Sequence, residues 1–276
     1  MKKYLVITFS LLLLFGCERP KGFTLKKITS YYEPSDRWDA FNTLSDETLL
    51  KIFNQTYSYL GSGNHTYAFV SEDGNYVMKF FKQKHMRIQS PLLSKDRIEK
   101  RKKEREESFS SYKIAFDYLR EETGLLYLHL NKTDFLKVTL MLIDQKGAPT
   151  LVNLDEMEFL IQKKGVLALQ HLGALIDQGA YDETLAHVRS LLNVVAKRNQ
   201  MGIYDKDLQF YKNFGFLDNK AIEIDIGEFK LDVEVPNTYE ELQRLTYQIS
   251  EFIREKSPEF APILEDEMNK EINRFQ

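Results

Sequence analysis

The chain has 276 residues, of which 43% are hydrophobic and 13% aromatic, and a formal net charge of -3. This composition indicates a globular chain with a sizeable core, and its charge gives no general attraction to nucleic acid. Cys17 is the single cysteine, which excludes an intramolecular disulfide and a cysteine-based zinc site.

Residues 1–16 have the pattern of a signal peptide. Lys2 and Lys3 precede an apolar run over residues 4–16, which is shorter than the roughly 20 residues that a membrane-spanning helix needs. Residues 14–17 (LFGC) resemble the lipobox of bacterial lipoproteins, in which a peptidase cuts before the cysteine. The resemblance implies that Cys17 carries diacylglycerol and palmitate, and that the domain is lipid-anchored in the cell envelope, outside the cytoplasm. The alternative is an uncleaved anchor or a buried first helix.

The next part of the chain predicts a tether, a short helix and three strands. Residues 17–39 contain Pro20 and Pro34 and no apolar period, which is typical of a tether. Ser45 is a good N-cap for a helix that ends near residue 53. Aromatic and β-branched residues at 57–60, 67–70 and 76–81 predict an antiparallel meander, with a turn at residues 73–74.

The middle of the chain predicts one helix and two more strands. Residues 94–122 favour a long helix that Gly124 ends, and residues 125–130 and 136–143 favour strands. The basic run at residues 97–105 is interleaved with glutamates, which indicates a solvated helix face. Together these elements predict an N-terminal lobe over residues 40–148, with a five-stranded antiparallel sheet and one helix.

From residue 149 to residue 276 the sequence predicts a mainly helical lobe. Apolar faces predict helices at residues 154–175, 182–199, 239–256 and 258–273. Two short strands at residues 214–217 and 221–224, joined at 218–219, form a small hairpin between them. We find no internal repeat.

Two motifs in the N-terminal lobe are typical of phosphate binding. Residues 60–66 (LGSGNHT) place Gly61, Ser62, Gly63 and Thr66 in a loop between the first two strands. Glycines there would let backbone N–H groups approach a phosphate closely. Lys79 lies on the third strand, on the face opposite to its apolar neighbours.

Two motifs in the C-terminal lobe complete a spacing used in phosphoryl transfer. Asp207 is followed six positions later by Asn213, and Asp225 begins the sequence Asp-Ile-Gly directly after an apolar strand. Phosphoryl-transfer enzymes place a base and two magnesium ligands in this order. Asp205 lies two residues before Asp207 and is a rival for the base.

The four motifs, in this order and on these elements, resemble the protein-kinase-like superfamily over residues 57–229. The resemblance implies a two-lobed α+β fold that binds ATP and Mg²⁺. Gly61, Ser62, Gly63, Thr66 and Lys79 would bind the nucleotide, and Asn213 and Asp225 would bind the metal. A glutamate of the long helix would pair with Lys79; Glu104 and Glu106 both flank its apolar side, and the distance from the next strand favours Glu106.

The resemblance also has departures, which keep three readings of the function open. Asp205 stands where the superfamily has histidine, the interval from Asp207 to Asn213 is one residue longer, and few residues follow Asp225 for peptide-binding helices. The first reading is a phosphotransferase that acts on a hydroxyl group of a protein or small molecule. The second is a catalytically inactive, pseudokinase-like lipoprotein that serves as a binding or envelope-assembly module. The third is a structural or envelope-assembly lipoprotein whose resemblance is accidental.

Overall fold

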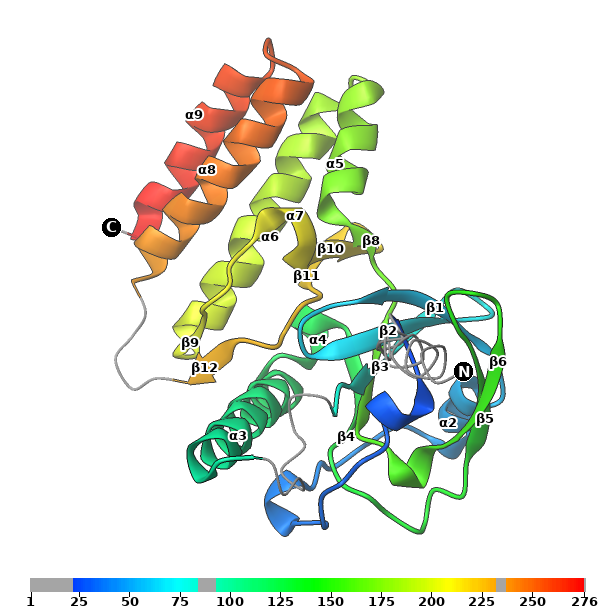
Figure 1. The fold of residues 1–276 in the computed structure, drawn as a ribbon. Helices are drawn as coiled ribbons and strands as arrows, with labels where there is room; N and C mark the ends of the chain where they lie inside the picture. The colour runs from blue at the N-terminus through cyan, green and yellow to red at the C-terminus, as the bar shows by residue number, and fades with distance from the viewer. Residues whose placement is uncertain (1–21, 84–92, 232–236, 276) are drawn as a thin grey trace, which may run out of the picture.

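The computed structural model describes residues 22–83, 93–231 and 237–275, so the predicted signal peptide and Cys17 lie outside the described residues. Figure 1 shows a lobe that contains the main sheet and, above it, a lobe built mainly of helices. No helix within the described ranges is long and apolar enough to cross a membrane.

The N-terminal lobe is built on a seven-stranded sheet with the order β4-β7-β3-β2-β1-β5-β6. Its pairs are antiparallel except that of β1 with β5, which is parallel. The aromatic residues of helix α3 pack in one apolar cluster with residues of β4, β7 and β12. The elements of this lobe are η1 (Leu25–Lys27), η2 (Asp36–Trp38), α2 (Asp46–Phe53), β1 (Tyr57–Ser62), β2 (Thr66–Ser71), β3 (Tyr76–Phe81), α3 (Lys95–Tyr118), α4 (Arg120–Thr123), β4 (Leu125–His129), β5 (Thr139–Ile143), β6 (Pro149–Asn153), η3 (Leu154–Glu156) and β7 (Phe159–Lys163).

The C-terminal lobe packs four long helices around one apolar cluster, with short strands at the side that meets the sheet. The chain enters this lobe through residues 164–165, where a Cβ on Gly165 would lie 3.1 Å from the Phe216 carbonyl oxygen. The elements of this lobe are β8 (Val166–Leu167), α5 (Ala168–Asp177), α6 (Tyr181–Gln200), β9 (Ile203–Asp205), α7 (Phe210–Asn213), β10 (Phe214–Leu217), β11 (Lys220–Glu223), β12 (Phe229–Leu231), α8 (Thr238–Lys256), α9 (Ala261–Ile272) and η4 (Asn273–Phe275). The predicted two-lobed α+β fold is confirmed.

Most predicted elements are present with nearly the predicted bounds. The Ser45 hydroxyl caps α2 by accepting a hydrogen bond from the Thr48 N–H, and Gly124 ends α4 with φ +64°. The predicted meander is β1 to β3, and the predicted hairpin is β10 and β11. Its turn residues, Asp218 and Asn219, both have positive φ, which is the conformation that a two-residue hairpin turn requires.

The predicted helix at residues 154–175 is wrong in its first half. Strand β7 occupies Phe159–Lys163, and helix α5 begins only at Ala168. Strand β7 lies between β3 and β4, inside the sheet. It takes the place of the fifth strand that the sequence predicted at residues 136–143. Those residues instead contain β5, which with β6 extends the sheet beyond β1. The last strand of the sheet therefore ends at Lys163, after the predicted lobe boundary at 148/149.

The predicted tether at residues 17–39 is also too long. Phe23, Ile28 and Trp38 are buried, and Phe23 packs edge-on against the rings of Tyr67 and Phe69. Residues from Gly22 onward therefore form part of the N-terminal lobe. The apolar clusters of both lobes consist of residues between Phe23 and Phe275, so residues 22–276 contain the whole described core.

Candidate functional site

The predicted motifs meet in one cavity of about 600 Å³ between the two lobes. The β1–β2 loop and β3 border it from the N-terminal lobe, and the segments around β9, α7 and β11 border it from the C-terminal lobe. Nine predicted site residues line this cavity: Gly61, Ser62, Gly63, Thr66, Lys79, Asp205, Asp207, Asn213 and Asp225. Sequence positions that are up to 164 residues apart are thus brought to one place.

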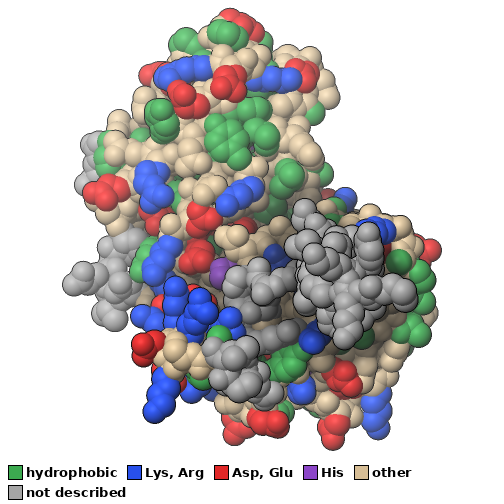
Figure 2. Space-filling model, in the orientation of Figure 1, with side chains coloured by type: hydrophobic (Ala, Val, Ile, Leu, Met, Phe, Trp, Pro, Cys, Tyr) green, Lys and Arg blue, Asp and Glu red, His purple; other side chains and the backbone are tan. Residues whose placement is uncertain are grey.

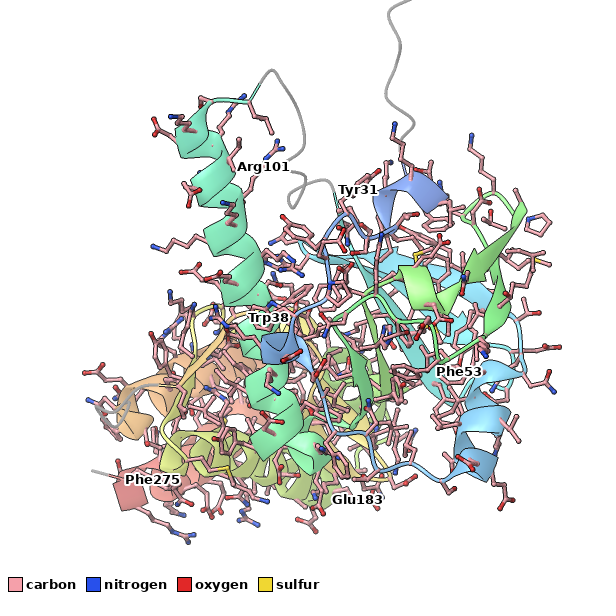
Figure 3. All side chains as sticks on the ribbon, turned by 90° about the horizontal axis from the view of Figure 1, so that it is seen from below. Tyr31, Trp38, Phe53, Arg101, Glu183 and Phe275 are labelled. Carbon is pink, nitrogen blue, oxygen red and sulfur yellow. The ribbon has the colours of Figure 1, made fainter. Side chains whose placement is uncertain are left out.

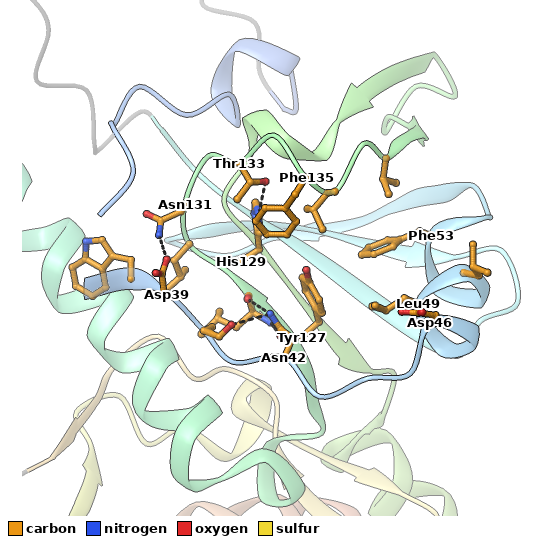
Figure 4. A pocket seen from close by; sticks show the side chains of 17 residues that line it. Asp39, Asn42, Asp46, Leu49, Phe53, Tyr127, His129, Asn131, Thr133 and Phe135 are labelled. Atoms are coloured by element: carbon orange, nitrogen blue, oxygen red, sulfur yellow. Dashed lines mark hydrogen bonds between the residues drawn. The ribbon is translucent and has the colours of Figure 1, made fainter. Parts of the chain in front are cut away.

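A second cavity, of about 760 Å³, lies in the N-terminal lobe beside α2 and β4 (Figure 4). Phe53, Tyr127, His129 and Phe135 line it, and both ring nitrogens of His129 are within hydrogen-bond distance of other groups of the lobe. It contains none of the predicted site residues. The cavity between the lobes is therefore the candidate functional site.

Asn213 is oriented so that its amide oxygen stays available. It ends α7, where its Nδ2 donates a 2.6 Å hydrogen bond to the Asp207 carbonyl oxygen. Its Oδ1 is buried and accepts no hydrogen bond from any described residue. The Asn213 carbonyl oxygen accepts a hydrogen bond from the Ile224 N–H at 2.7 Å, which holds Asp225 next to it in space. The two residues therefore present hard oxygen atoms to the same cavity.

These oxygen atoms fit a magnesium ion. Mg²⁺ prefers oxygen ligands, keeps several waters and needs only one or two carboxylates beside the phosphates of a nucleotide. Within the described ranges, no group of three or more His, Cys, Asp or Glu side chains could hold a metal. A site made of the Asn213 amide oxygen and the Asp225 carboxylate agrees with the preference of Mg²⁺ for oxygen and needs no larger cluster of such side chains.

Lys79 extends from β3 toward the Asp225 segment. Its Nζ donates a 2.5 Å hydrogen bond to the Ile224 carbonyl oxygen. Burial lowers the pKa of the Lys79 ammonium, and the negative charge of Asp225 partly offsets this. The ammonium group therefore lies beside Asp225.

The structure does not bring Glu106 to Lys79. Glu106 is exposed and forms an ion pair with Arg37 at 3.5 Å, while Glu104 pairs with Lys100 at 3.9 Å within α3. The prediction is wrong because the inner face of α3 at this level carries Arg105, which lies over the ring of Tyr32 at 3.8 Å.

Helix α3 reaches the site through two other residues, Ser111 and Tyr112. The Ser111 hydroxyl donates to the Ile226 carbonyl oxygen and accepts from the Phe229 N–H, both at 2.6 Å. Tyr112 is buried, lines the cavity and hydrogen-bonds Thr66 through its side chain. Both were missed, because the sequence reasoning searched this helix only for a carboxylate.

The two candidate bases, Asp205 and Asp207, have different surroundings. Asp207 is partly exposed, and its carboxylate accepts hydrogen bonds from Gln209 Nε2 at 2.5 Å and from Lys212 Nζ at 3.2 Å. Asp205 is 3% exposed, and its Oδ1 accepts the Asp207 N–H at 2.9 Å. Its Oδ2 is buried without a partner among the described residues. Burial raises the pKa of Asp205 to about 7, and the negative charge of Glu223 adds to the rise.

This pKa predicts that stability falls as pH rises from about 4 to about 7. With an ordinary value of 3.8 and a folded value of about 7, native Asp205 keeps its proton between pH 4 and 7 while the unfolded chain has lost it. The native state then binds more protons, so the free energy of unfolding decreases with pH, by up to about 1.4 kcal/mol per pH unit. Asp205→Asn, which mimics the protonated form, should gain about 2–3 kcal/mol of stability over the wild type between pH 5 and pH 8.

Urea unfolding at several pH values measures this difference. Asp134→Asn, in an exposed loop, is the matched control and should follow the wild-type curve. If the Asp205→Asn and wild-type curves run parallel from pH 5 to 8, native Asp205 ionises as readily as the unfolded residue.

A side-chain contact links the glycine loop to the C-terminal lobe. His65 Nε2 lies 3.2 Å from Glu228 Oε1, just after the Asp225-Ile226-Gly227 motif. Neither Gly61 nor Gly63 has positive φ, and a Cβ on either would meet no described atom within 4 Å. The protein itself therefore does not require glycine at these positions, whereas a ligand that approaches the backbone closely would.

No protein-family model matches the chain, and no curated protein matches it in sequence. Among solved structures it is similar to WbdD in complex with the kinase inhibitor LY294002, with 14% identity and a TM-score of 0.38, over 77% of this chain and 45% of that chain. It is also similar to monomeric WbdD, with 16% identity and a TM-score of 0.39, over 68% of this chain and 37% of that chain. A third WbdD structure is described as a bifunctional kinase-methyltransferase, with 14% identity. The chain spans less than half the length of these proteins, and such values do not carry their activities over to it.

Proposed function

We propose that this chain is a magnesium- and ATP-dependent phosphotransferase that is anchored to the bacterial cell envelope through lipid on Cys17, with its domain outside the cytoplasm. The observation that carries the proposal is the buried Oδ1 of Asn213, which has no hydrogen-bond partner among the described residues. Asn213 lines the cavity together with Asp225 and Lys79. A buried polar atom without a partner is costly unless a ligand completes it.

Each lining group has a role in this proposal. Backbone N–H groups of the glycine loop and the Lys79 ammonium would bind the phosphates, and Asn213 and Asp225 would hold magnesium. When bound, magnesium neutralises negative charge on the phosphates. Asp205 would act as the general base, because its pKa of about 7 suits proton transfer near neutral pH. Asp207 would orient the acceptor hydroxyl, which belongs to a protein or a small molecule.

A catalytically inactive binding module is the second candidate. It is favoured by the two hydrogen bonds that the Asp207 carboxylate accepts from Gln209 and Lys212, with which an acceptor hydroxyl would have to compete. The proposed location outside the cytoplasm, where ATP is scarce, favours it as well. Such a module would bind a nucleotide or a protein partner in the envelope without transferring phosphate.

A thermal-unfolding titration of residues 22–276 with ATP, with and without magnesium, tests the proposal. A ligand at 100 times its dissociation constant stabilises a protein by about 2.7 kcal/mol, which for a chain of this size raises the melting temperature by about 5–10 °C. We expect this shift only with magnesium present. The absence of any shift would exclude ATP binding, and a shift without transfer of labelled phosphate to any acceptor would favour the binding module.

A further inference from the structure

Charge is distributed unevenly along helix α3. Its first turns, residues 95–103, contain six basic and two acidic residues, whereas residues 104–107 contain three acidic residues and one basic residue. Within the acidic part, Glu106 pairs with Arg37 and Glu107 pairs with Lys230 at 3.7 Å, so these carboxylates are directed toward the body of the protein. The basic part is left at the projecting end of the helix.

This projecting end and the start of the described chain lie on the same side of the molecule. In Figure 3 the first turns of α3, with Arg101, and the segment that contains η1 and Tyr31 both stand at the top of the view. Figure 2, which views this side face-on, shows Lys and Arg side chains gathered over α3. The charge of Arg101 also acts on Tyr32, which places the helix and the N-terminal segment close together.

We define the basic face as η1 (Leu25–Lys27) and residues 95–103 of α3. Arg97, Lys100 and Arg101 line a shallow depression on it, together with Glu104. Two of its lysines form ion pairs within the helix, Lys102 with Glu99 at 3.0 Å and Lys100 with Glu104 at 3.9 Å. Such exposed pairs are weak and leave the local excess of positive charge in place. Leu25, which is 40% exposed, adds an apolar side chain to the same face.

The distance from the proposed anchor determines what this face meets. Four residues separate Cys17 from Gly22, where the packed lobe begins. Even fully extended, this stretch spans at most roughly 18 Å. A lipid on Cys17 would therefore hold the start of the lobe near the bilayer, where anionic headgroups attract basic residues within about 8–10 Å.

We infer that the basic face is a docking surface for an anionic membrane, and that it sets how the domain lies on the bilayer. The inference rests on the proposed Cys17 anchor, which brings the face to the membrane. Basic side chains bind the phosphate groups of the lipids, and Leu25 inserts at the interface. A single anchor leaves a domain free to turn, whereas anchor and basic face together fix one side toward the lipid.

Co-sedimentation of residues 22–276 with lipid vesicles tests the inference without the anchor and without ATP. We expect binding to vesicles of phosphatidylcholine and phosphatidylglycerol, weakened by salt, and no binding to phosphatidylcholine alone. The triple variant Arg97→Glu, Lys100→Glu and Arg101→Glu should bind the anionic vesicles at least about tenfold more weakly. The matched control replaces Lys256, Lys270 and Arg274 on the other lobe by glutamate, and it should bind like the wild type. Circular dichroism melting checks that both variants are folded.

Several outcomes would overturn the inference. The inference is wrong if both triple variants lose binding to the same extent, or if the wild type binds neutral vesicles as well as anionic ones. It is also wrong if duplex DNA binds through these residues and vesicles do not. Mass spectrometry of the full chain tests the anchor separately, through the acyl mass on Cys17. A missing acyl group would contradict the proposed location. The vesicle experiment could still be interpreted, because residues 22–276 do not contain Cys17.

Discussion

Asp225→Asn is expected to lower phosphoryl transfer by about 10³-fold or more and to remove the magnesium-dependent part of the thermal stabilisation by ATP. Asparagine keeps the size of the side chain but removes the negative charge that attracts the metal. The Lys79 ammonium, which lies beside Asp225, would also lose its nearby negative charge. Melting temperatures with ATP and magnesium, followed by transfer of labelled phosphate, measure the two effects.

The matched control for this variant is Asp218→Asn. Asp218 lies seven positions earlier, in the exposed turn between β10 and β11, and does not line the cavity. Its positive φ of 45° is one that asparagine adopts readily, so fold and activity should be kept. If Asp225→Asn retains magnesium-dependent stabilisation equal to that of the control, the assignment of Asp225 as a metal ligand is wrong.

Arg198→Met is expected to destabilise the protein by about 3–5 kcal/mol, which lowers the melting temperature by roughly 10 °C or more. Arg198 is fully buried, and its guanidinium donates to Glu223 at 2.8 Å and to Glu241 at 3.0 Å. Removing it leaves the buried carboxylate of Glu223 without its cation. Because the charge of Arg198 also acts on Asp205, the variant should disturb the candidate site as well.

Two further variants test that explanation by urea unfolding. Arg198→Met combined with Glu223→Gln removes both charges and should recover part of the lost stability. Arg189→Met breaks exposed pairs with Glu267 and Glu271 and should cost less than about 1 kcal/mol. Equal stability of the single and double Arg198 variants would show that the uncompensated charge is not the cause.

How well the sequence predicted the fold depended on the surroundings of each element. Helices α2, α6 and α8 and strands β1 to β4 were predicted with nearly correct bounds, whereas the edge strand β6 was missed. Strand β7 was missed because Phe159, Leu160 and Ile161 are all buried. A strand covered on both faces is a continuous apolar run, which is hard to distinguish from a buried helix. The packing of Phe23 and Trp38 was missed because isolated apolar residues carry no period.

The residues of the candidate site that were predicted lie in short motifs on loops and strand ends. Their chemistry is local, so the sequence indicates the glycine loop, Lys79, Asn213 and Asp225 before any packing is known. The contacts of Ser111 and Tyr112 depend on how α3 is rotated against the C-terminal lobe. Such a rotation is set by long-range packing, which also turned Glu106 toward Arg37.

The Ser111 bridge has a mechanical consequence for the cavity. The lobes are joined covalently at residues 164–165, and Ser111 of α3 ties the N-terminal lobe to Ile226 and Phe229 on the other side of the interface. Other contacts cross the same interface, including those of Glu107 with Lys230 and of His65 with Glu228. Helix α3 and the Asp225-Ile226-Gly227 segment are therefore held together, so a shift of the helix would move the predicted metal ligand Asp225 with it.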